Sequence, residues 1–391
     1  MEFSLLPWRR KGASARGGSK WGASKRGGAP LAVLTGWPVG SPVRGYEAQV
    51  RESYLRNTIA QRAVRLVAES AASAPWVSSP AGHPALQLLA SPNPGQPGAA
   101  FIEALASHLV LSGNAYVEVV LGPDDSPMEL HLLRPERVTV VPGPTGWPQE
   151  YRHTVGGVVT RYGVDPVTGR GDLLHIRAFH PLDDHYGLSP LEAAQLAIET
   201  HNAAGRWNKA LLDNAARPCG ALVFEPGQGA TLTQDQFDRL KAEMEAGFQG
   251  AANAGRPLLL EGGLKWQPLS LSPAELDFIE ARNAAAREIA LAFGVPPMLL
   301  GLPGDNTYAN YSEANRALWR LTVLPLLGKI ASSLSAYLGH WWEGLHLDIS
   351  RNAIPALAMD RERLWRQVAA ADFLSAEEKR HLLGLDRDCD G

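Results

Sequence analysis

Cysteine is scarce in this chain, which holds two, Cys219 and Cys389, among 391 residues. Two cysteines so far apart in sequence do not make a disulfide framework, so a reducing compartment is the default expectation. Long apolar runs are also missing, because the most apolar stretch, LTVLPLLG, is short and lies between Arg320 and Lys329. The first residues, MEFSLLPWRRKG, lack the order of charge, apolar core and cleavage site of a signal peptide. These absences predict a protein without a membrane partner.

Sequence motifs of catalysis are absent as well. The chain has no P-loop, no GxSxG elbow and no dinucleotide-binding fingerprint. The run HPLDDH at 180–185 offers residue types that bind metals, but a polar turn after a strand is the favoured interpretation, since no second cluster stands at helical spacing. DRDCDG at 386–391 matches only the first half of an EF-hand loop. We therefore expect no metal, no cofactor and no catalytic residue.

The composition is that of a globular protein, with 45% hydrophobic and 20% charged residues. The net charge of −3 is unevenly placed, because residues 1–28 are strongly basic with Glu2 as their one acid. This arm contains the imperfect repeat GASARGG and GASKRGG, which cannot bury a core, so we expect it to be disordered alone. Two interpretations stay open for the basic arm: contact with nucleic acid or an acidic protein surface, or a solvated tail.

Residues 30–187 predict a mixed α/β domain. Helical patterns cover 50–73 and 98–113, and six short strand-like runs follow between Gly, Pro and Asp turns. The strand-like runs are 115–121, 128–133, 137–141, 151–154, 158–162 and 172–177. The turn spacing favours antiparallel pairing.

Two long helices with the same start flank an insert. Ser189-Pro190-Leu191-Glu192 opens a helix to about Ala216, and Ser272-Pro273-Ala274-Glu275 opens a second to about Val295. Both helices are rich in alanine, which keeps their surfaces thin and permits close neighbours. The insert, 218–271, contains strand-like runs and a helix opened by Thr233 and Gln236, and predicts a small α/β module.

A loop rich in glycine and asparagine follows the second of these helices. Residues 301–311, GLPGDNTYANY, have neither a helical nor a strand period. A long helix is expected from Ser312, with a kink near Leu321 because Pro325 lies inside it. After residue 340 the chain is expected to be helical, with a further start at Ser375.

Several of these segments together resemble the portal proteins of tailed bacteriophages, including the versions in prophages and gene transfer agents. The segments are YGLSPLEAAQLAIE (186–199), NAARPCGALV (214–223), GAANAGRPLLLEGGLKWQPL (250–269) and FGVPPMLLG (293–301), the last followed by the short loop and a helix with an internal Leu-Pro. The resemblance covers roughly residues 100–340, and the motifs are specific in combination.

The resemblance implies an α+β portal fold and a set of domains. A wing would cover 30–187 after the arm at 1–29, and two stem helices would cover 188–217 and 272–296 around a clip at 218–271. A tunnel loop at 297–311, a long kinked wing helix at 312–342 and a short helical crown with a tail at 343–391 would complete the chain.

The resemblance also implies a function without chemistry of its own. A ring, a homododecamer in this family, would sit at one capsid vertex of the virion, conduct double-stranded DNA during packaging and ejection, and be assembled in the bacterial cytoplasm. Its partners would be the major capsid protein, the terminase large subunit and the head–tail adaptor. Two alternatives remain: another ring-forming connector of a phage tail, and a DNA-processing enzyme such as a nuclease.

Two groups of residues are expected to carry this function. The DNA-facing tunnel loop would present Asp305, Asn306, Thr307, Tyr308 and Asn310. The stem would pack and line the channel with Arg206, Lys209, Arg282, Ala285 and Arg287. Because lysine and arginine contacts with phosphate tighten DNA binding, a mostly acidic or neutral bore would let DNA slide.

Overall fold

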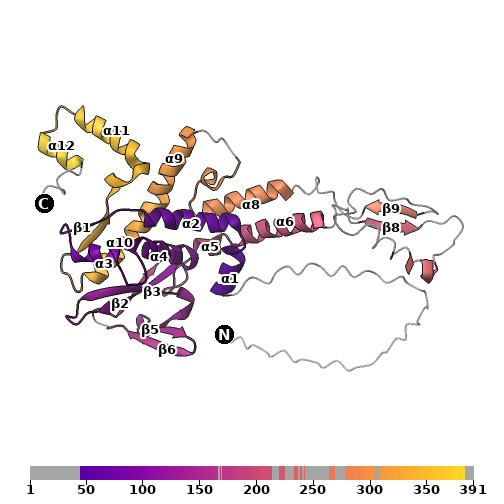
Figure 1. The fold of residues 1–391 in the computed structure, drawn as a ribbon, viewed down its shortest axis with the longest axis horizontal. Coiled ribbons are helices and arrows are strands. Elements are labelled where there is room, and N and C mark those ends of the chain that lie inside the picture. The colour runs from indigo at the N-terminus through magenta and orange to yellow at the C-terminus, as the bar shows by residue number, and fades with distance from the viewer. Residues whose placement is uncertain are drawn as a thin grey trace, which may run out of the picture. The chain divides into compact units, whose positions relative to one another are not determined.

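The computed structural model describes residues 45–165, 168, 170–213, 220–224, 233–236, 238, 239, 242, 264–268, 278–303 and 308–383. The basic arm, both cysteines and the DRDCDG run lie outside the described residues. Within them the chain is a mixture of helices and strands, as Figure 1 shows, which confirms the expected α+β class.

The α-helices are spread along the whole described chain. They are α1 (Tyr46–Ser53), α2 (Thr58–Ala72), α3 (Pro84–Ala90), α4 (Gly98–Ser112), α5 (Pro190–Ala193), α6 (Gln195–Asp213), α8 (Phe278–Ala292), α9 (Tyr308–Leu318), α10 (Leu324–Leu338), α11 (Ala358–Ala369) and α12 (Ala376–Leu382). Short 3₁₀ turns are η1 (Pro135–Arg137), η3 (Pro297–Leu300), η5 (Arg351–Ala353) and η6 (Pro355–Leu357), and η4 (Trp319–Val323) is a π-helical turn.

The strands form small antiparallel sheets. They are β1 (Trp76–Ser79), β2 (Asn114–Leu121), β3 (Pro127–Leu133), β4 (Val138–Pro142), β5 (Pro148–Val155), β6 (Val158–Gly163), β7 (Leu173–Arg177), β8 (Gly220–Phe224), β9 (Leu264–Pro268) and β10 (His346–Ile349). Their orders are β3-β2-β7, β4-β5-β6, β1-β10 and β8-β9. All six strand-like runs of residues 115–177 are strands, and their predicted antiparallel pairing is confirmed.

The main core gathers around helix α2, which packs against α4, α8 and α10. These helices bury their apolar faces at the spacing that their periodicity predicts. Fully buried side chains of the core include Val64, Phe101, Leu105, Ile289, Leu327, Ile330 and Leu334. A second, smaller core of Tyr116, Leu133, Val138, Val140, Tyr151, Tyr162 and Leu173 joins β3-β2-β7 to β4-β5-β6.

Two glycines, Gly113 and Gly187, allow two backbone segments to come into close contact where α4 ends. Gly113 has φ of 73° at the C-terminus of α4, and a Cβ there would lie 2.4 Å from the carbonyl oxygen of Gly187. A Cβ on Gly187 would in turn lie 2.1 Å from the carbonyl oxygen of Gly113. Only glycine fits at either position, so this contact fixes where the chain enters α5.

The structure corrects several expected boundaries. The helix expected at 50–73 is broken because Asn57 caps α2 by accepting hydrogen bonds from the backbone N–H groups of Ile59 and Ala60. The helix expected at 189–216 is divided at Ala194. The chain after residue 340 is not wholly helical, because β10 pairs there with β1. Its partner strand is distant in sequence, so no local pattern indicates it.

Candidate conduit and assembly site

Helices α6 and α8, expected as the stem pair, pack against each other in the structure. The face of α8 that is buried carries Ala285, Ala286, Ile289 and Ala290. Small alanine side chains let the two helix axes approach closely. The strand pair β8-β9 of the insert is antiparallel with Leu222 opposite Trp266, and most of the rest of the insert lies outside the described residues. The reciprocal hydrogen bonds of Thr233 and Gln236 there form the predicted capping box.

Ala285, expected as a packing residue of the stem, is buried within a single chain. Its side chain is 4% exposed, in the packing of α8. Ala284, one residue earlier, is exposed. A contact with a second copy would therefore use Ala284 and its exposed neighbours, while Ala285 stabilises the protomer itself.

Arg282 belongs to a polar network that joins three helices. Its Nε lies 3.3 Å from Nε2 of His201 on α6, and His201 Nδ1 lies 3.1 Å from the side-chain nitrogen of Asn57. The same nitrogen of Asn57 donates to Oδ1 of Asn202 at 2.9 Å. Burial, followed by the charge of Arg282, lowers the pKa of His201, which favours the neutral imidazole. Sequence reasoning missed Asn57, although asparagine before a helical run is a capping signal.

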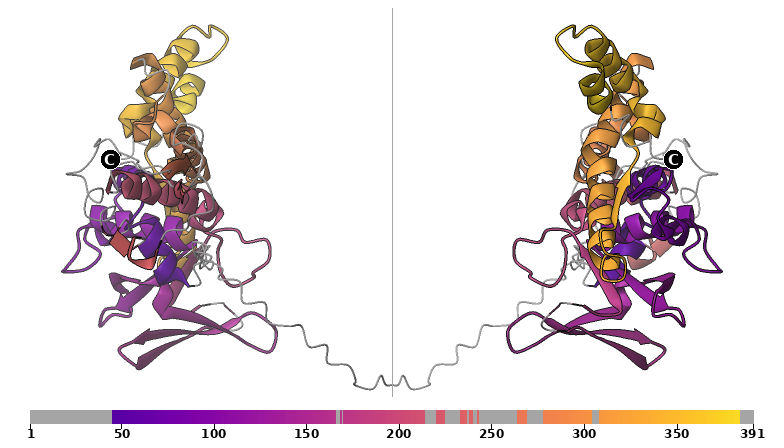
Figure 2. Two further views of the ribbon diagram at one scale, coloured as in Figure 1. Left: turned by 90° about the vertical axis from the view of Figure 1, so that its right-hand side faces the viewer. Right: turned by 90° about the vertical axis from the view of Figure 1, so that its left-hand side faces the viewer.

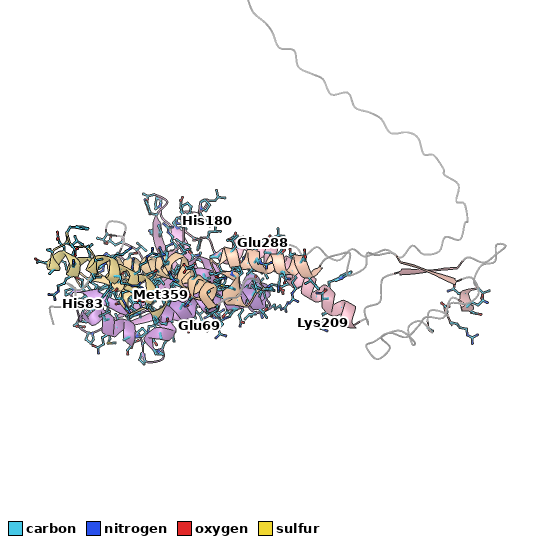
Figure 3. The ribbon with its side chains drawn as sticks, turned by 90° about the horizontal axis from the view of Figure 1, so that it is seen from above. Glu69, His83, His180, Lys209, Glu288 and Met359 are labelled. Carbon is cyan, nitrogen blue, oxygen red and sulfur yellow. The ribbon has the colours of Figure 1, made fainter. Side chains whose placement is uncertain are left out.

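The other expected stem cations are exposed. Arg206 and Lys209 are exposed on α6, and Figure 3 labels Lys209 together with Glu288 of α8. Arg287 of α8 donates a hydrogen bond from Nη2 to the carbonyl oxygen of Pro303 at 2.9 Å. This cation therefore ties α8 to the segment that leads into the expected tunnel loop.

The tunnel loop expected at 297–311, with 301–311 free of regular structure, ends earlier than predicted because α9 begins at Tyr308. Asp305, Asn306 and Thr307 lie outside the described residues, but Tyr308 and Asn310 are the first turn of α9 and not part of a loop. The loop's first part is anchored, because Leu302 is buried and its N–H donates to Pro297. The boundary was misplaced because asparagine and tyrosine lack a helical signal of their own, although both are tolerated near a helix start.

A π-helical turn lies where Pro325 predicts an irregularity in the long helix. Proline has no N–H to bond to Leu321, and residues Trp319–Val323 adopt π-helical geometry between α9 and α10. The hydroxyl of Thr322 in this turn donates to the carbonyl oxygen of Gly294 at 2.6 Å. This bond fastens the long helix to the end of α8, a role that no sequence pattern indicates.

The long helix also corrects the expectation that no segment approaches the length of a membrane span. Asn310–Leu338 is long and apolar enough to cross a membrane by length and composition, with a mean hydropathy of 1.4 in its most apolar window. Of that window, 44% is buried inside the protein. Its apolar residues Val323, Leu327, Ile330 and Leu334 belong to the main core, so packing accounts for part of its composition.

The HPLDDH run is a polar turn, as the sequence favours. Oδ1 of Asp183 accepts hydrogen bonds from the backbone N–H groups of His185 and Tyr186, which holds the pKa of that carboxyl below its usual value. The turn, on which Figure 3 labels His180, lines a surface pocket of about 520 Å³ together with exposed Trp147 and Phe179. Across the described residues no group of three or more His, Cys, Asp or Glu is placed to hold a metal ion.

The chain has close relatives among known proteins. An uncharacterized protein of Rickettsia bellii (strain RML369-C) is 43% identical over 348 residues, which is 87% of this chain and 89% of that protein. The probable portal protein of Streptomyces phage phiC31 is 31% identical over 169 residues, 43% of this chain and 36% of that protein.

The chain is also similar to solved structures. A chain from the neck of a native gene transfer agent (GTA) particle, computed with C12 symmetry, is 49% identical with a TM-score of 0.68, covering 89% of this chain and 95% of that chain. An HK97 family phage portal protein from Corynebacterium diphtheriae is 19% identical with a TM-score of 0.59, covering 81% and 100%, and shares the fold. Residues 58–384 match the family described as phage portal protein, and the chain belongs to that family.

Proposed function

We propose that this chain is the portal subunit of a gene-transfer-agent or phage-like particle. Copies of it form a ring at one capsid vertex, and double-stranded DNA enters and leaves the particle through that ring. The observation that carries the proposal is the 49% identity to a chain of the neck of a GTA particle computed with C12 symmetry, over 95% of that chain's length. A match over nearly the whole length supports an equivalent assembly rather than a shared module.

The described helices support the expected division of labour. We assign α6 and α8 to the stem, the strands β8 and β9 to the clip, and η3 with the segment before α9 to the tunnel loop. The sheets β3-β2-β7 and β4-β5-β6, with α2, α4 and α9–α10, make the wing. Helices α11 and α12 make the crown, while β10 belongs to the body because it pairs with β1.

The chain works in this proposal as a structural conduit and supplies no catalysis. The major capsid protein surrounds the ring, and the terminase large subunit and then the head–tail adaptor dock on the clip. The net charge of −3 includes a strongly basic arm, so the rest of the chain is more acidic than that value, which fits a passage that does not grip phosphate. The assembled ring belongs to the virion at the capsid vertex.

Electron microscopy of the purified chain tests this proposal directly. We expect ring-shaped class averages with a central hole, and a native mass that is a twelvefold or similar multiple of 42.1 kDa. A metal-dependent nuclease assay on the same protein tests the alternative that it is a DNA-processing enzyme. Measuring the DNA content of particles that lack the chain tests the alternative that it is a tail connector. A monomer that cleaves DNA, or full DNA packaging in particles without the chain, would contradict the portal assignment.

A further inference from the structure

Strand β6 forms an outer edge of the β4-β5-β6 sheet and is exposed on both faces over most of its length. Val158 is 69% and Val159 47% exposed, and Thr160 and Arg161 are exposed as well. Tyr162 alone is buried in the strand. In Figure 1 the strand lies beside β5 at the outer side of the sheet. Valine and threonine strongly favour strands, so this edge suits pairing with a further strand.

The direction of each backbone group on β6 follows from its pairing with β5. Val155 stands opposite Val158 across a turn of Gly156 and Gly157, and further along Val164 N donates to Gln149 O at 3.0 Å. Because hydrogen-bonded pairs alternate in an antiparallel ladder, Val158, Thr160 and Tyr162 bond to β5. The N–H and C=O groups of Val159 and Arg161 therefore point outward, away from the sheet.

Two other outer edges in the described part of the chain are covered. On β4 the outward N–H groups are those of Val138, which donates to Pro135 O, and Val140, which donates to the Tyr186 hydroxyl at 2.9 Å. On β3 the N–H of Leu130 donates to Pro92 O at 2.7 Å, and its carbonyl accepts from Asn93 at 2.9 Å. Proteins cover or blunt edges that must not pair. Within the part of the chain that the structure describes, no such bond covers the outward groups of Val159 and Arg161 on β6.

The charge beside this edge indicates the chemistry of its partner. Arg161 stands directly opposite Arg152 on β5, and like charges in that position repel. Glu150 forms an ion pair with Arg152, whereas Arg161 has no ion-pair partner among the described residues. A carboxylate on an incoming strand would balance Arg161.

We propose that the outer edge of β6 binds an extended segment of a different protein of the assembled particle. That segment adds a fourth strand to β4-β5-β6 through the backbone groups of Val159 and Arg161. It carries apolar side chains beside Val159 and a carboxylate beside Arg161. This is strand addition, in which main-chain hydrogen bonds give affinity and alternate side chains give specificity.

A second copy of this chain is the less suitable occupant. In a cyclic ring each contact joins two different surfaces of adjacent copies, so the edge of β6 cannot pair with the same edge of its neighbour. The edges of β3 and β4, two of the other outer edges, are covered on every copy and do not offer β6 of a neighbour a free partner. This step rests on the proposed ring, whose formation is measured separately by electron microscopy.

Amide hydrogen exchange resolved to single residues tests the proposal. The isolated ring and the native particle carrying it are compared, with and without packaged DNA. We expect the amides of Val159 and Arg161 to exchange at least about tenfold more slowly in the particle, while Val158, Thr160 and Tyr162 change little. If Val159 and Arg161 exchange at the same rate in the isolated ring and in the particle, the proposal is overturned. Fast exchange in both samples would mean that no strand binds, and slow exchange in both would mean that a second copy of this chain supplies it. Protection lost with the DNA would assign the edge to phosphate contact and also overturn it.

Paired variants separate strand addition from a folding defect. Val159→Pro removes an outward N–H that β5 does not use, and Val159→Thr keeps it. Arg161→Glu reverses the charge, and Arg161→Lys keeps it. The readout in all four variants is the amide at position 161, because proline leaves none at 159. We expect the proline and glutamate variants to form normal rings but to lose at least about tenfold of the particle-dependent protection at that amide, with the threonine and lysine variants unchanged. The proposal would be contradicted if the β6 amides of all four variants became as protected in particles as those of the natural chain.

Discussion

Nη2 of Arg287 donates a 2.9 Å hydrogen bond to the carbonyl oxygen of Pro303, and so joins the middle of α8 to the residue just before 304–307. Leu302, next to Pro303, is buried and bonded to Pro297. The base of the proposed tunnel loop is therefore held from two sides. A displacement of α8 would act on Pro303 through this bond, which would couple the proposed stem to the proposed tunnel loop.

Replacing Arg287 by glutamine is expected to loosen the base of this loop. A hydrogen bond from a charged group is worth about 1.5–3 kcal/mol, and less here because Arg287 is exposed. Amide exchange at Leu302 should accelerate several-fold while the Tm changes little. Glu288→Gln, at an exposed neighbouring position, is the control. Unchanged exchange at Leu302 in the Arg287 variant would show that the bond does not restrain the loop.

Tryptophan at Ala284 and at Ala285 should have different effects. Ala285 is buried inside the protomer, so Ala285→Trp overpacks the contacts of α8 and is expected to destabilise the protomer by about 1–3 kcal/mol or more. Ala284 is exposed, so Ala284→Trp should leave the protomer Tm nearly unchanged and disrupt rings if this face contacts a second copy. Thermal unfolding and light scattering measure the two effects. Intact rings with Ala284→Trp would remove this face of α8 from the subunit contact.

Acid should destabilise the protein through two partly buried histidines, His108 and His175. Burial lowers the pKa of His108 to about 4 and that of His175, which stacks on Tyr116, to about 3. Below about pH 6.5 these histidines take up protons in the unfolded chain but not in the folded chain. Their contribution to the free energy of unfolding is therefore fully present above that pH and is lost as the pH drops towards 4. Each histidine contributes a slope of about 1.4 kcal/mol per pH unit in that window.

The Tm of variants measured between about pH 7.5 and about pH 5 tests this pH dependence. His175→Gln should lose less stability on acidification than the natural chain does. His346→Gln, which removes an exposed histidine, should lose as much as the natural chain. The same acid-induced decrease in Tm in all three proteins would contradict the assignment to His175.

Cations placed in the proposed tunnel loop should slow DNA. Asp305→Lys combined with Asn306→Lys adds ammonium groups that bind phosphate and raise friction on the duplex. We expect particles that assemble but fill with DNA slowly or incompletely. Asp305→Asn with Asn306→Gln is the control without new cations. Filling and ejection at the natural rate in the lysine variant would mean that the loop does not face DNA.

The sequence predicted the elements whose signals are local. Alanine-rich helical periods located α6 and α8, Ser189-Pro190 located the start of α5, and alternating apolar residues located β2 to β7 within one or two residues at most ends. Pro325 indicated the position of the π-helical turn. Each of these depends on residues close together in the chain, which is what a single sequence displays directly.

The remaining features depend on contacts between distant residues. The pairing of β1 with β10, and the bond from Thr322 to Gly294, leave no pattern in either segment taken alone. Ala285 and Ala284 are also alike in sequence, and the packing of α8 against elements distant in the chain decides which of the two is buried. The sequence also does not show that Arg287 bonds to Pro303, because the two residues are brought together only by the fold.

The pairing of Trp76–Ser79 with His346–Ile349 has a consequence for synthesis. A ribosome releases the first strand long before it makes the second, and chains emerge at about 5–20 residues per second. The body therefore stays incomplete for the time needed to translate the intervening residues, and a truncated chain cannot close it. Such a chain exposes core residues near β1 and is a substrate for proteolysis before it can enter an assembly. Late closure thus restricts assembly to copies that have been translated almost to their end.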